Sequence, residues 1–321
     1  MMSAFAYKAP HSLQNAVSDL DAEWGVTDIL AGGTDLLALM KEGIETPKTV
    51  VSLKKIPGLA EIKVTDTGVE IGALATLDQI ATHAGIAKHL PALSAAAEVI
   101  GGPQIRNMGT LGGNLCQRNR DWYFRNQLDP EVKAETQYAA IFSDQATYVH
   151  PSTLAPPLIA YGATVEIAGP KGNKTLPVEK LFQVAVGGKR ETVLAPNEIV
   201  TKVTIPVKAG VQSADYEVRE RDSHDWPLVQ ASVALTSNGG KVTSASILLG
   251  HVGPLPVRAT AAEKSLIGKA VTAETAAAAA KAAVAGAKPL EKNAYKVTLA
   301  EVAVKRALLA AVGNAYWRNG A

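Results

Sequence analysis

Two short glycine-rich segments carry the residues best suited to chemistry in this sequence. They are AGGTD at 31–35 and GTLGGN at 109–114. Glycine tolerates positive φ and leaves backbone N–H groups open to an anion, because no side chain stands in the way. Thr34, Thr110 and Asn114 add short hydrogen-bonding side chains. One such segment after a strand can hold one phosphate, and two can hold a pyrophosphate from both sides.

Neither segment matches a standard nucleotide-binding motif. The Rossmann pattern G-x-G-x-x-G is absent, and no Gly-Lys-Ser/Thr follows either segment as it does in a P-loop. Two structural turns therefore remain the alternative interpretation.

Other groups of reactive residues are weaker candidates. Ser223, His224 and Asp225 are adjacent, and contiguous residues do not normally fold into a nucleophile, a base and an orienting acid. His150, His224 and His251 lack the spacing of metal ligands, so we interpret each as a turn or surface histidine and expect no metal site. No general acid, base or nucleophile stands out, and the sequence predicts no catalytic residue.

The bulk properties exclude several classes of protein. A formal net charge of +2 over 321 residues gives no electrostatic case for nucleic-acid binding. Cys116 is the only cysteine, so no internal disulfide can form, and we expect a buried, small apolar side chain rather than a redox thiol. The first residues contain no apolar run of signal-peptide length, and no run approaches the ~20 residues of a membrane span. We expect a cytoplasmic protein, or a periplasmic one if a partner carries the export signal.

Hydrophobic periodicity predicts alternating helices and strands around the glycine segments. A helix within 11–24, with Ser12 as its N-cap, precedes a strand that runs into the first segment. A later strand and turn lead into a helix entered at Thr76. A hairpin turns through residues 170–172. Near Ala214 the composition shifts to a three-stranded meander and two strong helices.

The residues around both glycine segments resemble one known family. ILAGGTDLL and QIRNMGTLGGNL, followed by HPSTLAPPLIAYGATVEI, PNEIVTKVTIP and YEVRERDSHDWPLVQASVAL, are similar to the FAD-binding subunits of the molybdenum hydroxylases. This family includes xanthine dehydrogenase, aldehyde oxidoreductase and carbon monoxide dehydrogenase. The resemblance spans nearly the whole chain and ends with the helix LAEVAVKRALLAA.

The resemblance implies an α+β fold. A two-part FAD-binding region of the PCMH type would occupy residues 1–212, with subdomains of about 1–55 and 56–212. A smaller domain like the C-terminal domain of the CO dehydrogenase flavoprotein, with a three-stranded sheet and helices, would occupy residues 213–321. That boundary agrees with the composition shift.

The resemblance also implies which residues bind FAD. The backbone from Ile29 to Leu37 would wrap the pyrophosphate, Thr34 and Asp35 would add polar contacts, and the second segment would close on the same group. The residues assigned to the cofactor in this way are Ile29, Leu30, Ala31, Gly32, Gly33, Thr34, Asp35, Leu36, Leu37, Gly109, Thr110, Gly113, Asn114, Thr153, Val200 and Glu217.

Two of these positions depart from the family's pattern. Thr153 follows the His-Pro-Ser turn, where the family often has an aspartate that meets the adenosine ribose. Glu217 stands where many relatives have a lysine near the flavin ring, so its carboxylate would disfavour negative charge on the reduced ring. An ordinary surface charge is the alternative for Glu217. Val200 matches a position that packs against the flavin.

The segment NLCQRNRDWYFR resembles the bacterial three-subunit aldehyde oxidoreductases, which carry an extra four-iron four-sulfur cluster in an insertion at this point. Asp121 replaces the first cysteine ligand, no cysteine follows, and the insertion is shortened to about residues 126–136. Such a cluster needs four thiolates, so we expect none here. We interpret Trp122, Tyr123 and Phe124 as anchors of a loop, with a subunit contact as a further role.

The implied function is that of an electron-transfer subunit with non-covalently bound FAD. A large partner with molybdopterin would oxidise an aldehyde or an N-heterocycle, and a small partner with two-iron two-sulfur clusters would pass the electrons to this chain. A small-molecule or protein acceptor, such as oxygen, NAD or a quinone, would then take them. The alternatives are a stand-alone flavin oxidoreductase of related fold and a degenerate subunit that keeps the fold as a structural bridge.

Overall fold

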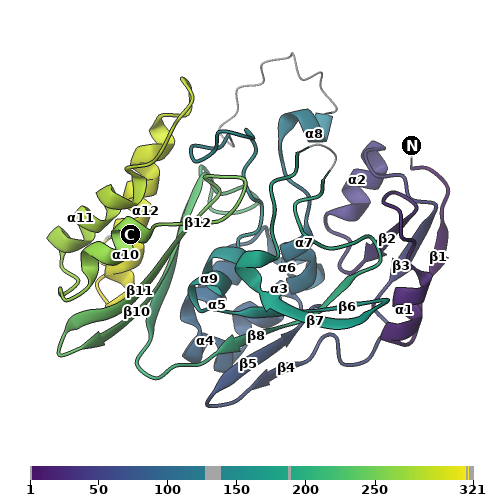
Figure 1. Cartoon of the computed structure of the whole chain (residues 1–321), viewed down its shortest axis with the longest axis horizontal. Coiled ribbons are helices and arrows are strands. Elements are labelled where there is room, and N and C mark those ends of the chain that lie inside the picture. Colours follow the sequence, from purple (N-terminus) through teal and green to yellow (C-terminus); the bar gives the residue numbers. More distant parts are fainter. Residues whose placement is uncertain (1, 127–138, 187–188, 316, 318–321) are drawn as a thin grey trace.

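Three β-sheets follow one another along the chain, each with its own helices (Figure 1). The computed structural model describes residues 2–126, 139–186, 189–315 and 317. The strands of each sheet are consecutive in sequence, and in the middle sheet the helices α3 to α9 lie between β5 and β6. The fold is mixed α+β, as expected.

The N-terminal unit is a small parallel sheet with strand order β1-β3-β2. Its elements are β1 (Ala6–Lys8), α1 (Leu13–Asp19), β2 (Thr27–Leu30), α2 (Leu36–Glu42) and β3 (Thr49–Ser52). Ser12 caps α1 by accepting a hydrogen bond from the amide of Asn15, which confirms the predicted helix start.

The middle unit is an antiparallel sheet with strand order β4-β5-β8-β6-β7, covered by short helices. Its elements are β4 (Ile62–Val64), β5 (Gly68–Gly72), α3 (Leu77–Thr82), α4 (Ala84–His89), α5 (Pro91–Glu98), α6 (Pro103–Met108), α7 (Leu111–Cys116), α8 (Trp122–Asn126), α9 (Ala155–Ala160), β6 (Thr164–Gly169), β7 (Gly172–Pro177), the 3-10 turn η1 (Val178–Lys180) and β8 (Ile199–Pro206). Thr76 forms a capping box with Gln79 at the start of α3, and β6 pairs with β7 through a turn at 170–171. Both predictions are confirmed.

The C-terminal unit is an antiparallel sheet with strand order β12-β11-β10-β9. Its elements are β9 (Gln212–Val218), β10 (Val229–Asn238), β11 (Lys241–Gly250), β12 (Val257–Arg258), α10 (Thr260–Leu266), α11 (Ala273–Val284) and α12 (Tyr295–Ala311). The predicted three-stranded meander is β9 to β11. The sequence pattern missed β12, which has two residues and therefore no readable alternation, and the short helix α10.

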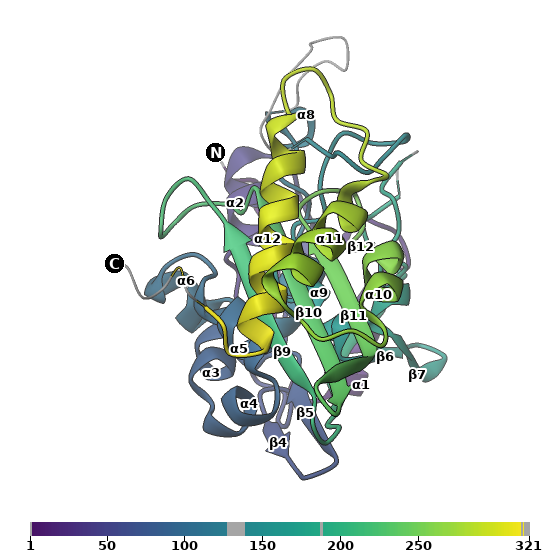
Figure 2. The ribbon, with the colours of Figure 1, turned by 90° about the vertical axis from the view of Figure 1, so that its left-hand side faces the viewer.

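The C-terminal sheet is buried on both faces. Helices α10, α11 and α12 cover one face, as Figure 2 shows, and α5 and α9 of the middle unit pack on the other. Leu248 of β11 accordingly belongs to the hydrophobic core of the middle unit, whereas its neighbours Ile247 and Leu249 belong to the C-terminal core. This alternation gives the sheet one face toward the middle unit and one toward the C-terminal helices. No helix in the described ranges has both the length and the apolar composition needed to cross a bilayer.

Lys296 is the largest fully buried side chain and lies in the first turn of α12. Its ammonium group donates to the carbonyl oxygens of Ala139, at 3.0 Å, and His251, at 2.8 Å. Burial lowers the pKa of Lys296 from its ordinary 10.5 to about 7. The side chain therefore connects α12 to two segments at the edge of the sheet. With a pKa of about 7, it is charged in only part of the molecules at neutral pH.

We predict that Lys296 makes stability depend on pH above neutrality. Between pH values of about 7 and 10.5 the unfolded chain binds a proton at this lysine that the folded chain has lost. The free energy of unfolding should therefore rise with pH, by up to about 1.4 kcal/mol per pH unit from this group. Urea titrations over this window, on the wild type and Lys296→Met, would measure the difference. Parallel slopes for the two proteins would contradict the prediction.

Candidate functional site

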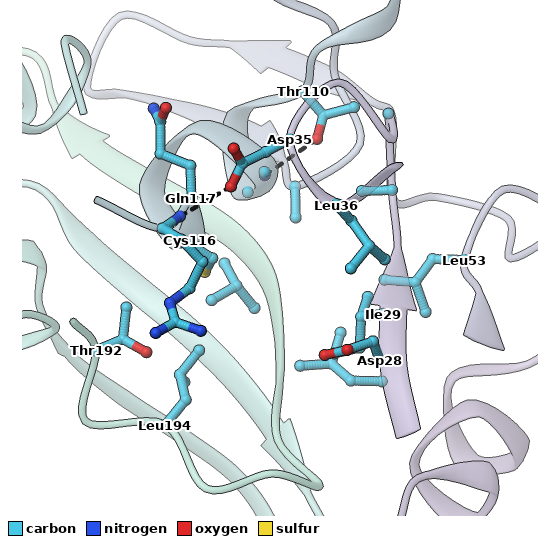
Figure 3. Close-up of a pocket in the computed structure, with 18 of the residues that line it drawn as sticks. Asp28, Ile29, Asp35, Leu36, Leu53, Thr110, Cys116, Gln117, Thr192 and Leu194 are labelled. Carbon is cyan, nitrogen blue, oxygen red and sulfur yellow. Dashed lines mark hydrogen bonds between the residues drawn. The ribbon is translucent and has the colours of Figure 1, made fainter. Parts of the chain in front are cut away.

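Two cavities meet at the two glycine segments. The first lies between the N-terminal unit and strand β8, and the second lies between α6, α7 and the loop after β9. Figure 3 shows the first cavity, with Asp28, Ile29 and Leu53 on one side, Thr192 and Leu194 on the other, and Asp35 and Thr110 at one end. The residues that line both cavities are Thr34, Asp35, Thr110, Gly113 and Gln117.

The first glycine segment leaves the end of β2 and enters α2. Gly33 adopts φ 82°, a left-handed conformation that favours glycine. Gly32 packs directly on the backbone carbonyl of Met108, so close that a Cβ atom would overlap its oxygen. Glycine is therefore required at position 33 by the backbone conformation and at position 32 by the contact with the backbone of Met108.

The first segment also presents unpaired backbone donors. Within the described residues, no acceptor meets the amide N–H groups of residues 32–36, and the first amide of this stretch to find one is that of Leu37, which bonds the carbonyl of Gly33 at 3.1 Å. These five residues all line the first cavity. Successive free amides at the start of a helix form a binding site for an anion such as phosphate.

The second glycine segment is a helix start rather than the loop expected from its glycines. Thr110 caps α7 by accepting from the amide of Gly113 at 3.1 Å. The amides of Leu111 and Gly112 donate to carbonyl oxygens of residues 75 and 73, and the amide of Asn114 donates to Thr110. The backbone donors of residues 111–114 are therefore already used within the chain, whereas the amide of Thr110 meets no acceptor among the described residues.

Asn114 is likewise committed to the fold. Its Oδ1 atom accepts from the hydroxyl of Ser152 at 2.7 Å and from the amide of Leu154 at 3.3 Å. The side chain thus ties α7 to the segment before α9. Contacts of Thr110 and Asn114 with a ligand stay predictions.

The carboxylate of Asp35 holds the arginine-rich segment 118–125 against the first glycine segment. It accepts from the amide of Arg118 and from the guanidinium of Arg125, both at 2.9 Å, and it pairs with Arg120 at 3.4 Å. Asp35 was expected to contact a pyrophosphate. Its carboxylate oxygens contact arginines instead. A carboxylate is more stable beside these positive charges than beside the negative charge of a pyrophosphate.

A buried network of ion pairs extends from this point. Arg118 pairs with Glu45, and with Glu191 at 2.9 Å, and Arg190 pairs with Glu45 at 2.9 Å. The guanidinium of Arg120 lies 3.9 Å from the ring centre of Trp226 in the second cavity. Burial lowers the pKa of Arg120 to about 10, which leaves it charged at neutral pH.

Each cavity has one buried carboxyl oxygen without a hydrogen-bond partner in the described part of the chain. In the first cavity it is Oδ2 of Asp28, and in the second it is Oε1 of Glu217. Burial raises the pKa of Asp28 to about 6, with Glu45 adding to the effect, and raises that of Glu217 to about 8, with Asp215 adding to the effect. Glu217 is therefore not the ordinary surface charge considered as its alternative role.

Three cofactor assignments cannot all hold together. Val200 and Glu217 were both expected beside the flavin, and Thr153 beside the adenosine ribose. The structure places Val200 in the first cavity, whereas Thr153 and Glu217 line the second. The spacing of residues in the sequence does not show which of the two cavities a residue from another helix or strand will line.

Cys116, Asp121 and the shortened insertion were the remaining candidates in the sequence. Cys116 is half-buried rather than fully buried as expected, because it lines the first cavity, and its desolvation raises the pKa of the thiol to about 12. Asp121 begins α8, where its Oδ2 accepts from the amide of Tyr123. Residues 127–136 of the shortened insertion lie outside the described residues.

The histidine interpretation was wrong for His150, whereas His251, with φ 59°, lies in a turn although it is not at the surface. His150 and His251 are buried, and His150 packs edge-on against Phe182 with ring centres 4.3 Å apart. His224 does sit in a turn, with φ 52°. The adjacent Asp225 accepts from three amides of its own loop, so the Ser-His-Asp run forms no triad. No cluster of potential metal ligands occurs in the ranges that the structure describes.

Sequence reasoning missed several residues of the two cavities. Asp28 precedes the glycine segment but lies outside its motif, and Trp226 is far from both segments in the chain. Arg118, Arg120 and Arg125 stood in a segment that the sequence suggested for an aromatic anchor or a subunit contact. Three arginines within eight residues, directly after a glycine segment, were the available signal for a charged wall.

Sequence comparisons identify both parts of the chain. A family described as "FAD binding domain in molybdopterin dehydrogenase" matches residues 3–208, and one described as "CO dehydrogenase flavoprotein C-terminal domain" matches residues 214–311. The carbon monoxide dehydrogenase medium chain of Hydrogenophaga pseudoflava is 31% identical over 312 residues, which cover 96% of each chain. The aldehyde oxidoreductase FAD-binding subunit PaoB of Escherichia coli is 31% identical over 317 residues, covering 94% of this chain and 96% of that one.

A comparison of structures gives the same result. A chain of quinoline 2-oxidoreductase from Pseudomonas putida 86 superposes with a TM-score of 0.80 and 27% sequence identity. The match covers 98% of this chain and 99% of that chain. The arrangement of all three sheets is therefore shared with this enzyme.

We predict that Gly32→Ala weakens FAD binding by about tenfold or more. The added Cβ would overlap the carbonyl of Met108, and overpacking of this kind costs about 1–3 kcal/mol, here by forcing the two glycine segments apart. FAD titration followed by flavin fluorescence measures the effect. Gly286→Ala is the matched control, since its nearest atom would be a ring carbon of Phe142 at 3.9 Å. Equal affinities in both variants would contradict the role of the contact.

Proposed function

Because this chain belongs to the FAD-binding subunits of the molybdenum hydroxylase family, we propose that it transfers electrons from an iron–sulfur partner to an external acceptor. The partner complex would oxidise an aldehyde or an N-heterocycle at a molybdopterin centre on a large subunit. A small subunit with two-iron two-sulfur clusters would connect that centre to this chain.

The observation that carries this proposal is the row of free amides at residues 32–36 between two cavities. FAD is a molecule with two ring systems joined by a pyrophosphate. A backbone site for the phosphates with one cavity on each side fits that division. The arginines behind Asp35 add positive potential without occupying the amides.

The linings of the cavities support an orientation for FAD. Aliphatic side chains dominate the first cavity and suit the flat adenine ring, so Val200 and Ile29 would pack against adenine and Asp28 would meet the polar groups of the adenosine. The second cavity brings Glu217, Thr153 and Arg120 together, and these match the polar edge of an isoalloxazine ring. This orientation reverses the expected places of Thr153 and Val200.

The residues of this chain bind and orient the cofactor rather than react. When bound, FAD supplies an acceptor for electrons taken up one or two at a time. Trp226 and its stacked Arg120 form one wall of the second cavity and limit the access of water from that side. The unpaired oxygens of Asp28 and Glu217 offer one polar contact to each ring system.

The names of relatives support the class of reaction. Similar chains belong to an aldehyde oxidoreductase of Escherichia coli, a nicotinate dehydrogenase of Eubacterium barkeri and a nicotine 6-hydroxylase of Paenarthrobacter nicotinovorans. Quinoline 2-oxidoreductase adds a further N-heterocycle. The carbon monoxide dehydrogenases, which match equally well, define the alternative substrate.

We predict that Val200→Phe weakens FAD binding much more than FMN binding. A larger side chain in the first cavity would compete with adenine, which FMN lacks. A loss of about tenfold or more in FAD affinity, with FMN affinity changed less than about twofold, is expected from overpacking confined to one cavity. FMN binding in the same variant is the control for an intact second cavity. Equal losses for both flavins would contradict the orientation.

We also predict that the FAD-loaded chain alone does not oxidise aldehydes or N-heterocycles, and that it takes up electrons within its complex. Purification of the natural complex should yield molybdenum and iron on other chains. Anaerobic addition of substrate should bleach the flavin in the complex and leave it unchanged in the isolated chain. Bleaching of the isolated chain would favour a stand-alone oxidoreductase, and purification of the complex without flavin would favour a structural bridge.

A further inference from the structure

Glu217 brings a buried carboxyl group to the wall of the second cavity. Its side chain is 5% exposed, and within the described residues its Oε1 atom has no hydrogen-bond partner. The other oxygen lies 3.6 Å from Nε of Arg219, which is too far for a normal hydrogen bond. That guanidinium is held elsewhere, because it donates to the carbonyl oxygen of Val99 at 2.7 Å.

The neutral donors around Glu217 are used mainly by other groups. Gln230 faces Glu217 across the β9–β10 pair, and its amide nitrogen donates to the carbonyl of Thr153 at 2.8 Å and to Asp215 at 2.9 Å. The hydroxyl of Thr153 pairs with Nε2 of His251 at 3.3 Å. Among the described residues Thr153 alone lowers the pKa of Glu217 through a hydrogen bond, so a charged Glu217 would lack most of the hydrogen bonds that normally stabilise a buried carboxylate.

The charged groups near Glu217 come from four parts of the chain. Asp215 and Arg219 flank it on β9 and just after it, while Arg120 lies on the arginine-rich segment and is paired with Asp35. The titratable groups that line the same cavity are Asp35, Arg120, His224 and Asp225. Burial, with Asp215 adding to it, outweighs the opposing effects of Arg219 and of a hydrogen bond from Thr153, and raises the pKa of Glu217 to about 8. Glu217 accordingly keeps its proton at neutral pH.

We propose that Glu217 is uncharged in the FAD-loaded protein and donates a hydrogen bond from its carboxyl group to an acceptor atom on the polar edge of the flavin ring. This inference rests on the proposed place of the ring in the second cavity. It replaces the expectation of a negative charge beside the flavin. A neutral donor favours electron density on the atom it contacts, whereas a carboxylate would oppose it.

The proposal predicts that FAD binding weakens as Glu217 loses its proton. From about pH 6.5 to about pH 9, the dissociation constant of the wild type should rise by about tenfold relative to that of Glu217→Gln, as linkage requires for a pKa near 8. The other titratable groups of the cavity are present in both proteins, so the ratio isolates Glu217. Glu217→Met, which keeps the volume without a donor, should bind FAD about two- to twelvefold more weakly at low pH.

Flavin removed by dialysis and added back in a fluorescence titration provides these constants. The absorption band of the bound flavin provides a second readout, and it should shift between the wild type and Glu217→Met. Glu220→Gln is the matched control, because Glu220 is exposed and does not line the cavity. It should follow the wild type at every pH.

The outcomes separate this inference from the proposed function. Absence of FAD binding at any pH would contradict the proposed function itself. Tight binding whose pH dependence is the same in the wild type and Glu217→Gln would overturn the donor role of Glu217 alone. An unchanged absorption band would overturn it as well, since a ligand contact away from the flavin ring leaves that band unmoved.

Discussion

The contact between the backbone of Gly32 and the carbonyl of Met108 is the constraint on which the site depends. It brings the end of β2 in the N-terminal unit against the end of α6 in the middle unit, with no space for a side chain between them. Beside this contact, the amides of residues 32–36 find no acceptor in the described chain. The two cavities lie on either side of this junction and share five lining residues there. A phosphate site and two ring-sized recesses are thus consequences of one close approach.

The arginines around Asp35 keep its carboxylate from binding the free amides of the first glycine segment. A row of free amides attracts an anion, and a carboxylate of the chain itself would compete for it. Asp35 is prevented from doing so because three arginines bind its oxygens. Arg118 is in turn balanced by Glu45 and Glu191, and Arg190 also pairs with Glu45, whereas Nε of Arg120 has no hydrogen-bond partner among the described residues. Buried ion pairs are favourable only when such geometry and additional hydrogen bonds compensate for lost hydration. The near-neutral net charge of the chain conceals this local arrangement.

The sequence predicted what depends on local chemistry. Ser12 and Thr76 cap helices because their hydroxyls suit the first amides of a turn, and the hairpin at 170–171 follows from its turn residues. The sequence could not predict that Thr110 would cap a helix whose amides are already bonded, since their acceptors at residues 73 and 75 come from another segment. The same limit applies to Val200 and Thr153. The packing of β8 and of the segment before α9 decides which cavity each residue lines. Hydrophobic periodicity in the sequence does not predict this packing.

The unpaired carboxyl oxygens bear on whether the chain has become a structural bridge. A buried polar atom without a partner costs about 1–3 kcal/mol, and an aliphatic side chain of similar volume would remove that cost. The protein nevertheless keeps Asp28 in one cavity and Glu217 in the other, at positions separated by almost two hundred residues. Around Glu217 the neighbouring polar groups are bonded in ways that leave its oxygen free, since Gln230 turns its amide to Thr153 and Asp215. Oε1 of Gln230, which faces Glu217 across the β9–β10 pair, also lacks a partner in the described residues, and a bound ligand that reached these oxygens would offset the cost. The departures from the family pattern at Thr153 and Glu217 are therefore better explained as altered contacts to a bound flavin than as loss of the site.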